Sequence, residues 1–197
     1  MSHEGDLVCI ACSVFRDELE ALRDAGRFDL PVLYLDSLLH ADGKALRRAI
    51  EKLLGPERKR GRKVLLLYGD CHPYIDEHEA ESGVARVEAM NCCDALLGRE
   101  GYRTLRREGV FFLMPEWGAR WQEVIQTQIG MNRTNTRSFM TDMHTKLLYL
   151  DTGLVSVPAE SLDEASDFTG LPWGSIGVSH DHLLAAIEEA KERVDAK

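Results

Sequence analysis

The sequence predicts a three-layer α/β protein, in which a mostly parallel sheet carries helices on both faces in a Rossmann-like, doubly wound arrangement. Short apolar runs alternate with amphipathic stretches along the whole chain. Runs such as residues 7–12 (LVCIAC) and 64–68 (VLLLY) are apolar throughout, which is typical of strands buried on both faces. Strand–helix alternation with right-handed crossovers then places helices on the two faces of the sheet.

The first half of the chain contains four predicted strands and three predicted helices. Residues 15–25 and 45–54 repeat apolar side chains at helical spacing, with charged residues on the opposite face. The basic run at 57–63 (ERKRGRK) is expected to be a solvated turn. The strands are expected at residues 7–12, 31–35, 64–68 and 84–90, and the third helix at 92–97.

In the second half, Gly98 and Gly101 interrupt the helical pattern before the next apolar run, at residues 110–114 (VFFLM). Strands are expected there and at two later runs, and amphipathic or apolar spacing indicates three more helices. The later strands are residues 147–151 and 176–178, and the helices are residues 117–129, 138–144 and 183–194.

The composition is that of an ordinary globular protein. The chain has 197 residues, of which 44% are hydrophobic and 29% are charged. Since a domain has roughly 150 residues, we expect a single α/β domain over residues 1–197. This interpretation leaves room for a smaller C-terminal lobe from about residue 131.

The charge balance argues against a nucleic-acid partner. Lys and Arg number 24 against 33 Asp and Glu, so the net charge is −9, whereas phosphate binding needs a positive field. No apolar run reaches the ~18 residues of a membrane-spanning helix, and the acidic start (MSHEGD) lacks the features of a signal peptide. We therefore expect a cytoplasmic protein without a membrane partner, whose five Cys are thiols or metal ligands rather than disulfides.

Cysteine and histidine side chains follow four successive predicted strands. Cys12 ends the first strand, and His40 lies beyond the second. Cys71 follows the third strand, and Cys92 follows the fourth. Because ligands of open parallel sheets bind outside the carboxyl ends of the strands, we expect these four side chains to meet at one edge. Thiolates bind soft and borderline metals, so the set predicts a metal site, with zinc favoured and a [4Fe–4S] cluster as the alternative.

Burial is the competing interpretation of these thiols, because free Cys is among the most buried residue types. Cys9 lies in the middle of a strand and is expected to be a core residue. Cys93 is expected to pack, since adjacent residues on a helix point in different directions. Helix starts near Cys12 and Cys92 are expected to lower the pKa of these thiols and to favour the ligand form.

Acidic side chains at the same sheet edge are candidates for acid–base chemistry. Asp70 follows the third strand and Glu116 follows the strand at 110–114, and both are assigned a catalytic role. Asp36 and Asp151 also end strands, where they either orient a metal-bound imidazole or cap the next segment.

The remaining histidines rank below His40 as ligands. His72 stands next to Cys71 and is a weaker candidate for the same site, whereas His78 lies in an acidic segment and is expected to be solvated. Capping or surface positions are expected for two others, His180 and His182. The sequence contains none of the glycine-rich phosphate-binding motifs, no G-x-S-x-G and no H-E-x-x-H.

Five short motifs occur together in this chain: Ile10-Ala11-Cys12, Leu39-His40, Tyr68-Gly69-Asp70-Cys71, Asn91-Cys92 and Tyr149-Leu150-Asp151-Thr152. With them the chain resembles an uncharacterised bacterial and archaeal family, domain of unknown function 1638. The resemblance implies that Cys12, Cys71 and Cys92 are the recurrent set and that His40 is their companion. The chain departs from the family pattern at three places: His72 for a glycine, Asn91-Cys92-Cys93 for His-Cys-Tyr, and Pro115-Glu116 for Thr-Asp.

The resemblance also implies a metabolic setting, because members of the family occur beside corrinoid-dependent methyl-transfer systems. We therefore expect a metalloenzyme that acts on a small molecule in corrinoid-linked methyl, one-carbon or thiol metabolism. A corrinoid protein or a methyltransferase is the expected protein partner. The alternatives are an iron–sulfur protein, a non-catalytic protein that handles metal or corrinoid, and an α/β binding protein with buried thiols.

Overall fold

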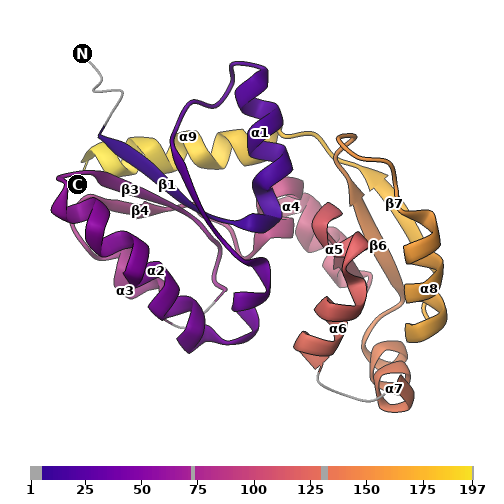
Figure 1. Cartoon of the computed structure of the whole chain (residues 1–197). Coiled ribbons are helices and arrows are strands. Elements are labelled where there is room, and N and C mark those ends of the chain that lie inside the picture. The colour runs from indigo at the N-terminus through magenta and orange to yellow at the C-terminus, as the bar shows by residue number, and fades with distance from the viewer. Residues whose placement is uncertain (1–5, 72–73, 130–132, 197) are drawn as a thin grey trace. The chain divides into compact units, whose positions relative to one another are not determined.

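A computed structural model describes residues 6–71, 74–129 and 133–196 (Figure 1). The chain divides into two compact units. The first consists of Met1–Leu96 and His180–Lys197, and the second of Leu97–Ser179. The lobe boundary expected at about residue 131 falls inside the second unit.

Four parallel strands form the sheet of the first unit, in the order β2-β1-β3-β4. Strands β1 and β3 are central and almost completely buried, as expected for a sheet covered on both faces. The chain runs from β1 outward to β2 and then back past β1 to β3, so the strand order reverses between β1 and β3. The strands are β1 (Leu7–Cys12), β2 (Val32–Leu35), β3 (Lys63–Leu67) and β4 (Val84–Arg86).

Helices cover both faces of this sheet. Helix α2 packs against β1, β2 and β3, and α9 packs against β3 and β4; Figure 1 shows these two helices on opposite faces. Asp42 caps α2 by accepting hydrogen bonds from the amides of Lys44 and Ala45, both at 3.0 Å. The helical elements are η1 (Ser13–Phe15), α1 (Arg16–Asp24), η2 (Ser37–Ala41), α2 (Gly43–Lys59), α3 (Ile75–Glu79) and α9 (Asp181–Ala196).

Helix α4 (Cys92–Arg107) connects the two units in sequence. Its helical geometry is interrupted at Gly98, where φ is 71° and ψ is 156°. A positive φ favours glycine because glycine has no Cβ atom, so Gly98 permits the break that the sequence predicts. The division between the units falls next to this break, between Leu96 and Leu97.

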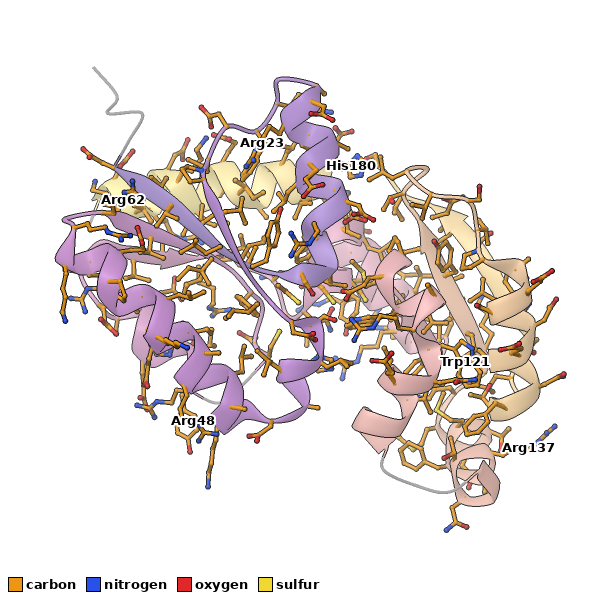
Figure 2. The ribbon with its side chains drawn as sticks, in the orientation of Figure 1. Arg23, Arg48, Arg62, Trp121, Arg137 and His180 are labelled. Carbon is orange, nitrogen blue, oxygen red and sulfur yellow. The ribbon has the colours of Figure 1, made fainter. Side chains whose placement is uncertain are left out.

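Three parallel strands form the sheet of the second unit, in the order β5-β6-β7. Helix α8 packs against β7 and against α5, α6 and α7. Trp121 is buried, and its ring lies 5.2 Å from that of Phe168 in α8 (Figure 2). The elements are β5 (Val110–Leu113), α5 (Pro115–Ala119), α6 (Trp121–Ile129), α7 (Arg133–Met143), β6 (Lys146–Asp151), α8 (Ala159–Thr169) and β7 (Trp173–Gly177).

The predicted three-layer α/β class with parallel strands is confirmed, and the structure assigns the strands to two sheets. In the described parts of the chain, no strand pairing joins β4 to β5. The strand expected at residues 84–90 ends at Arg86, and the helix expected at 117–129 is two helices that separate at Arg120. Helix α8 was not predicted from the sequence, because small and polar side chains form much of its buried face. The buried residues are Leu162, Ala165 and Thr169.

The basic run at 57–63 is not a solvated turn over its whole length, because α2 continues through Lys59. Glu57 is only 5% exposed and binds two arginines: Arg60, and Arg62, whose Nη1 lies 2.9 Å from Glu57 Oε2 (Figure 2). A buried carboxylate needs charged partners, and the basic run supplies them. Among the described residues, no helix is long and apolar enough to cross a membrane.

Candidate functional site

The predicted ligand residues of the first unit all follow its strands. Cys12 ends β1, His40 lies in η2 after β2, Cys71 follows β3 and Cys92 follows β4. The strand order reverses between β1 and β3, and in open parallel sheets ligands bind at the carboxyl end of such a switch point. Cys12 and Cys71 therefore belong to the two strands that flank the preferred binding position of this fold.

The loops after β3 and β4 lie with their backbones in close contact. The Asp70 amide donates a hydrogen bond to the Met90 carbonyl at 2.9 Å. A Cβ atom on residue 69 would lie 2.6 Å from the backbone nitrogen of Asn91 and 2.6 Å from the carbonyl carbon of Met90. Glycine at position 69 thus permits an approach that brings the loop of Cys71 beside the start of α4.

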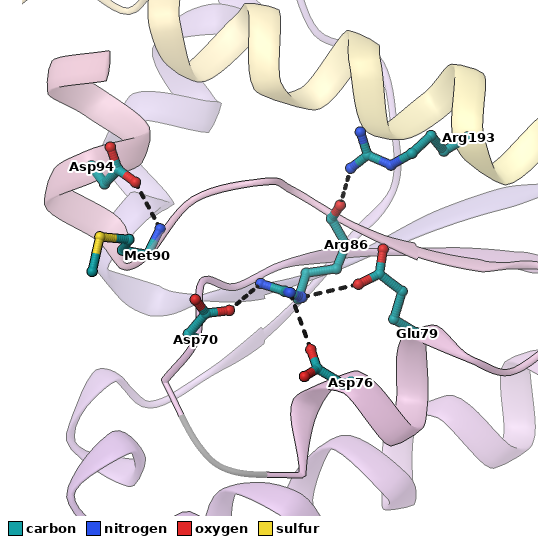
Figure 3. Close-up of polar contacts among 7 residues, drawn as sticks. All are labelled: Asp70, Asp76, Glu79, Arg86, Met90, Asp94 and Arg193. Carbon is teal, nitrogen blue, oxygen red and sulfur yellow. Dashed lines mark hydrogen bonds and ion pairs between the residues drawn. The ribbon is translucent and has the colours of Figure 1, made fainter. Parts of the chain in front are cut away.

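Hydrogen bonds fix the start of α4 and with it the position of Cys92. The Asp94 amide donates to Asn91 Oδ1 at 3.0 Å, and the Met90 amide donates to Asp94 Oδ2 at 2.7 Å (Figure 3). Asn91 is thus the N-cap, and Asp94 reaches back in the manner of a capping box. The spacing Asn91-x-x-Asp94 before an apolar run is a sequence signal for this cap that the sequence prediction did not use.

The thiols of Cys71 and Cys92 both have raised pKa values. Burial and the nearby Cys92 raise the pKa of Cys71 to about 12, against an opposing hydrogen bond to the Gly69 backbone. A hydrogen bond with Cys93, together with burial, holds the pKa of Cys92 well above its ordinary value. The expectation that the helix start lowers the pKa of Cys92 is therefore wrong, because Cys93 and burial outweigh the backbone N–H groups.

The direction expected for Cys93 is also corrected by the structure. Its Sγ atom lies 4.0 Å from the Sγ atom of Cys92, so the two thiols lie side by side rather than pointing apart. Cys93 is buried, and Cys9 is completely buried in the middle of β1, as expected for a core residue. Burial raises the pKa of Cys9 to about 12.

Tyr68 is a residue of this edge that the sequence prediction missed. Its side chain is buried, and its hydroxyl has no hydrogen-bond partner among the described residues. Burial raises the pKa of Tyr68 well above its ordinary value, and the neighbouring Cys12 and Cys71 raise it further. The phenol of Tyr68 therefore lies near thiols from both flanks of the switch point. Its sequence signal is the single polar group at the end of an apolar strand.

His40 is oriented by the backbone of its own 3₁₀ turn. Its Nδ1 atom contacts the carbonyl oxygen of Ser37, and the Ser37 amide donates to Ser13 Oγ at 3.0 Å. A carbonyl can only accept a hydrogen bond, so the proton of the neutral imidazole lies on Nδ1 and the acceptor lone pair on Nε2. Within residues 6–71, 74–129 and 133–196, no group of three or more His, Cys, Asp or Glu side chains is arranged to hold a metal ion.

Asp70, one of the two predicted catalytic residues, is held by Arg86 at the end of β4. Figure 3 shows the Arg86 guanidinium between three carboxylates: Asp70 at 2.7 Å, Asp76 at 3.2 Å and Glu79 at 3.2 Å. The Arg86 side chain is 13% exposed and that of Asp70 is 62% exposed, so the carboxylate reaches solvent while its partner is largely covered. An arginine inside the otherwise apolar stretch 84–87 is the sequence signal for this cluster.

Glu116, the other predicted catalytic residue, lies in α5 of the second unit. Its Oε1 atom accepts a hydrogen bond from Arg120 Nη1 at 2.8 Å, and Arg120 Nη2 also binds Glu123 at 2.8 Å. Glu116 is thus a member of a helix-surface ion-pair cluster.

The other polar residues named from the sequence have structural positions. Asp36 accepts a hydrogen bond from the Leu38 amide at 2.8 Å, so it caps the next segment, which is one of the two roles expected for it. Asp151 likewise accepts from the Gly153 amide at 2.9 Å. His78 is buried rather than solvated, with Nδ1 3.6 Å from Glu81 Oε1, because α3 turns this side chain inward. His72 lies outside the described residues.

The first unit thus defines a class: a parallel α/β protein whose sheet edge carries thiols on both sides of a topological switch point. The family described as Protein of unknown function (DUF1638) matches residues 34–187, and the chain belongs to this family. The predicted resemblance is therefore confirmed. The match includes His40, Cys71 and Cys92 and begins after Cys12. Neither the curated proteins nor the solved structures include a significant match.

Proposed function

We propose that this protein is a metal-dependent enzyme that binds a transition metal, with zinc favoured, at the carboxyl edge of the β2-β1-β3-β4 sheet. Cys12, Cys71 and Cys92 supply the thiolates in this proposal, and His40 supplies the fourth ligand. The observation that carries the proposal is topological: the four side chains follow β1, β2, β3 and β4 of one parallel sheet, and Cys12 and Cys71 flank its switch point.

The donor set fits zinc by its chemistry. Thiolates and neutral imidazole are the usual ligands of zinc, and a proton on His40 Nδ1 leaves Nε2 as the donor atom. Since no three such side chains are grouped for metal binding in the described residues, the thiols have to draw together when the metal binds. Bound zinc lowers the pKa of a coordinated water or thiol, which is the chemistry it supplies.

The residues around the thiols have distinct roles in this proposal. Asp70 is the candidate acid or base, and a 2.7 Å ion pair with Arg86 orients its carboxylate. Gly69 allows the close approach of the loops that carry Cys71 and Cys92. Glu116 belongs to the second unit and remains a separate candidate catalytic residue.

The substrate is proposed to be a small molecule of corrinoid-linked methyl, one-carbon or thiol metabolism, with a corrinoid protein or methyltransferase as partner. The family resemblance supports this setting. An iron–sulfur cluster protein and a metal-handling protein without turnover are the alternatives. They predict, respectively, iron with sulfide in a brown protein, and bound metal without activity toward methyl or thiol substrates.

Elemental analysis of protein purified without oxygen tests the proposal. We expect about one zinc per chain, and a loss of most of it in each of the variants Cys12→Ser, Cys71→Ser and Cys92→Ser. Cys9→Ala is the matched control, because Cys9 is buried inside β1 rather than at the sheet edge. Metal-free parent protein, or variants that keep the metal content of the parent, would contradict the proposal.

A thermal melt in chelator separates a functional metal from a structural one. Zinc that holds a small fold together contributes on the order of 10 kcal/mol. A chain of 197 residues buries enough apolar surface to fold without it, so we expect little change of the melting temperature in chelator. A large collapse of the melting temperature would identify the metal as structural.

A further inference from the structure

The adjacent thiols Cys92 and Cys93 are spaced as ligands of one ion. Their Sγ atoms lie 4.0 Å apart. Two thiolates at about 2.3 Å from a shared ion are separated by about 3.8 Å in tetrahedral geometry and by about 4.0 Å in trigonal geometry. A disulfide requires about 2.05 Å, so the observed spacing suits chelation without a change of the helical backbone.

A third thiol, Cys71, lies on the loop that packs beside this pair. The close contact between Gly69 and Asn91 and the hydrogen bond from Asp70 to Met90 hold the loop of Cys71 beside the start of α4. The capping hydrogen bonds of Asn91 and Asp94 fix the backbone from which Cys92 and Cys93 project.

We propose that Cys92 and Cys93 form a vicinal dithiol that chelates one thiophilic ion, with Cys71 as the third thiolate. The proposal deepens the proposed function, on which it rests: Cys71 and Cys92 are shared with the zinc ligands, and Cys93 replaces Cys12 as the third thiolate when the ion is thiophilic. Three soft donors favour thiophilic ions such as Cd²⁺ over harder divalent ions. Each thiol that binds the ion releases one proton to solvent.

Cadmium titration under anaerobic conditions tests whether Cys93 is one of three thiolate ligands. The sulfur-to-cadmium charge-transfer absorbance is proportional to the number of bound thiolates. The parent should show the absorbance of three thiolates, and Cys93→Ala and Cys93→Ser should each show about one third less. Loss of the chelating partner should weaken Cd²⁺ binding by at least about tenfold, because the second thiol acts at high effective concentration. Cys9→Ala should match the parent.

Phenylarsine oxide tests the dithiol without a divalent metal. Two As–S bonds form, the oxygen leaves as water with both thiol protons, and arsenic stays trivalent. We expect one equivalent to bind the parent and the Cys9→Ala control, and none to bind the Cys93→Ala variant. If that variant does not fold, peptide mapping of the labelled parent locates the arsenic, and a bridge outside Cys92–Cys93 overturns the proposal.

The two experiments separate this inference from the proposed function. A parent that binds neither zinc nor cadmium but captures phenylarsine oxide at Cys92–Cys93 would overturn the metal-dependent function and retain the dithiol. A parent that binds zinc or cadmium, with the same affinity and absorbance in both Cys93 variants, would overturn the role of Cys93 and leave the metal proposal intact.

Discussion

Gly69 and Asn91 stand so close that a Cβ atom on residue 69 would lie 2.6 Å from the Asn91 backbone nitrogen. Gly69→Ala should therefore push apart the loops after β3 and β4 and lower the free energy of unfolding by about 1–3 kcal/mol. Urea unfolding of the two proteins measures this difference. Metal binding should weaken in the same variant, because the loops carry Cys71 and Cys92.

Gly101→Ala is the matched control for this substitution. Gly101 lies inside α4, and a Cβ atom there would meet only Leu97 Cβ, at an ordinary contact distance of 3.8 Å. Since glycine costs roughly 0.5–1 kcal/mol relative to alanine inside a helix, this variant should be as stable as the parent or more stable. A Gly69→Ala variant with the stability of the parent would show that the loops can separate at little cost.

Arg86 is expected to stabilise the first unit through its three carboxylates. In Arg86→Gln, Asp70, Asp76 and Glu79 lose their shared cation and repel one another, so unfolding should become easier by about 1–2 kcal/mol. The figure is modest because Asp70 and Asp76 are 62% and 80% exposed and solvent screens them. Denaturant melts measure the loss, and Arg48→Gln, at an exposed position on α2, should show none.

The Tyr68 hydroxyl is buried without a hydrogen-bond partner among the described residues. Tyr68→Phe should therefore leave the stability unchanged or raise it by up to about 1 kcal/mol, because it removes a polar group that burial disfavours. Equilibrium unfolding checks this expectation.

A hydroxyl that does have a partner supplies the comparison. Ser166 Oγ donates to the Leu171 carbonyl at 2.7 Å, so Ser166→Ala should cost about 1 kcal/mol. If Tyr68→Phe costs as much as Ser166→Ala, the phenol is hydrogen-bonded in solution.

His144 is expected to make the second unit less stable in mild acid. Burial lowers its pKa below the ordinary value of 6.5, against a weaker opposing effect of the Gly109 carbonyl, 3.3 Å from Nδ1. The unfolded chain therefore binds the proton more readily. The stability is complete above pH 6.5 and is lost progressively as the pH falls from there to the lowered folded pKa.

Asparagine at position 144 removes this titration and keeps a donor for the Gly109 carbonyl. The free energy of unfolding of the parent should fall relative to His144→Asn as the pH drops below about 6.5. His182→Asn, at an exposed position, should follow the parent throughout. Parallel pH profiles for the parent and His144→Asn would show that this histidine does not titrate differently on folding.

The strands and the parallel α/β class were predictable because their signal is local. An uninterrupted apolar run such as residues 64–68 has to be buried on both faces, wherever it lies in the chain. The positions of Cys12, Cys71 and Cys92 after strands of one sheet were predictable for the same reason, since parallel strands place their carboxyl ends at one edge. The cap at Asn91 and the break at Gly98 also have local signals.

Packing between segments far apart in the chain determines the strand pairing and the side-chain contacts, which the sequence did not predict. The apolar pattern does not encode which strands pair, so the division into two sheets was not readable from it. The side-by-side thiols of Cys92 and Cys93, the burial of His78 and the position of Arg86 between three carboxylates depend on side-chain directions and neighbours. Such contacts arise only when the backbone is folded, because their free energy comes from desolvation and from partners brought together in space.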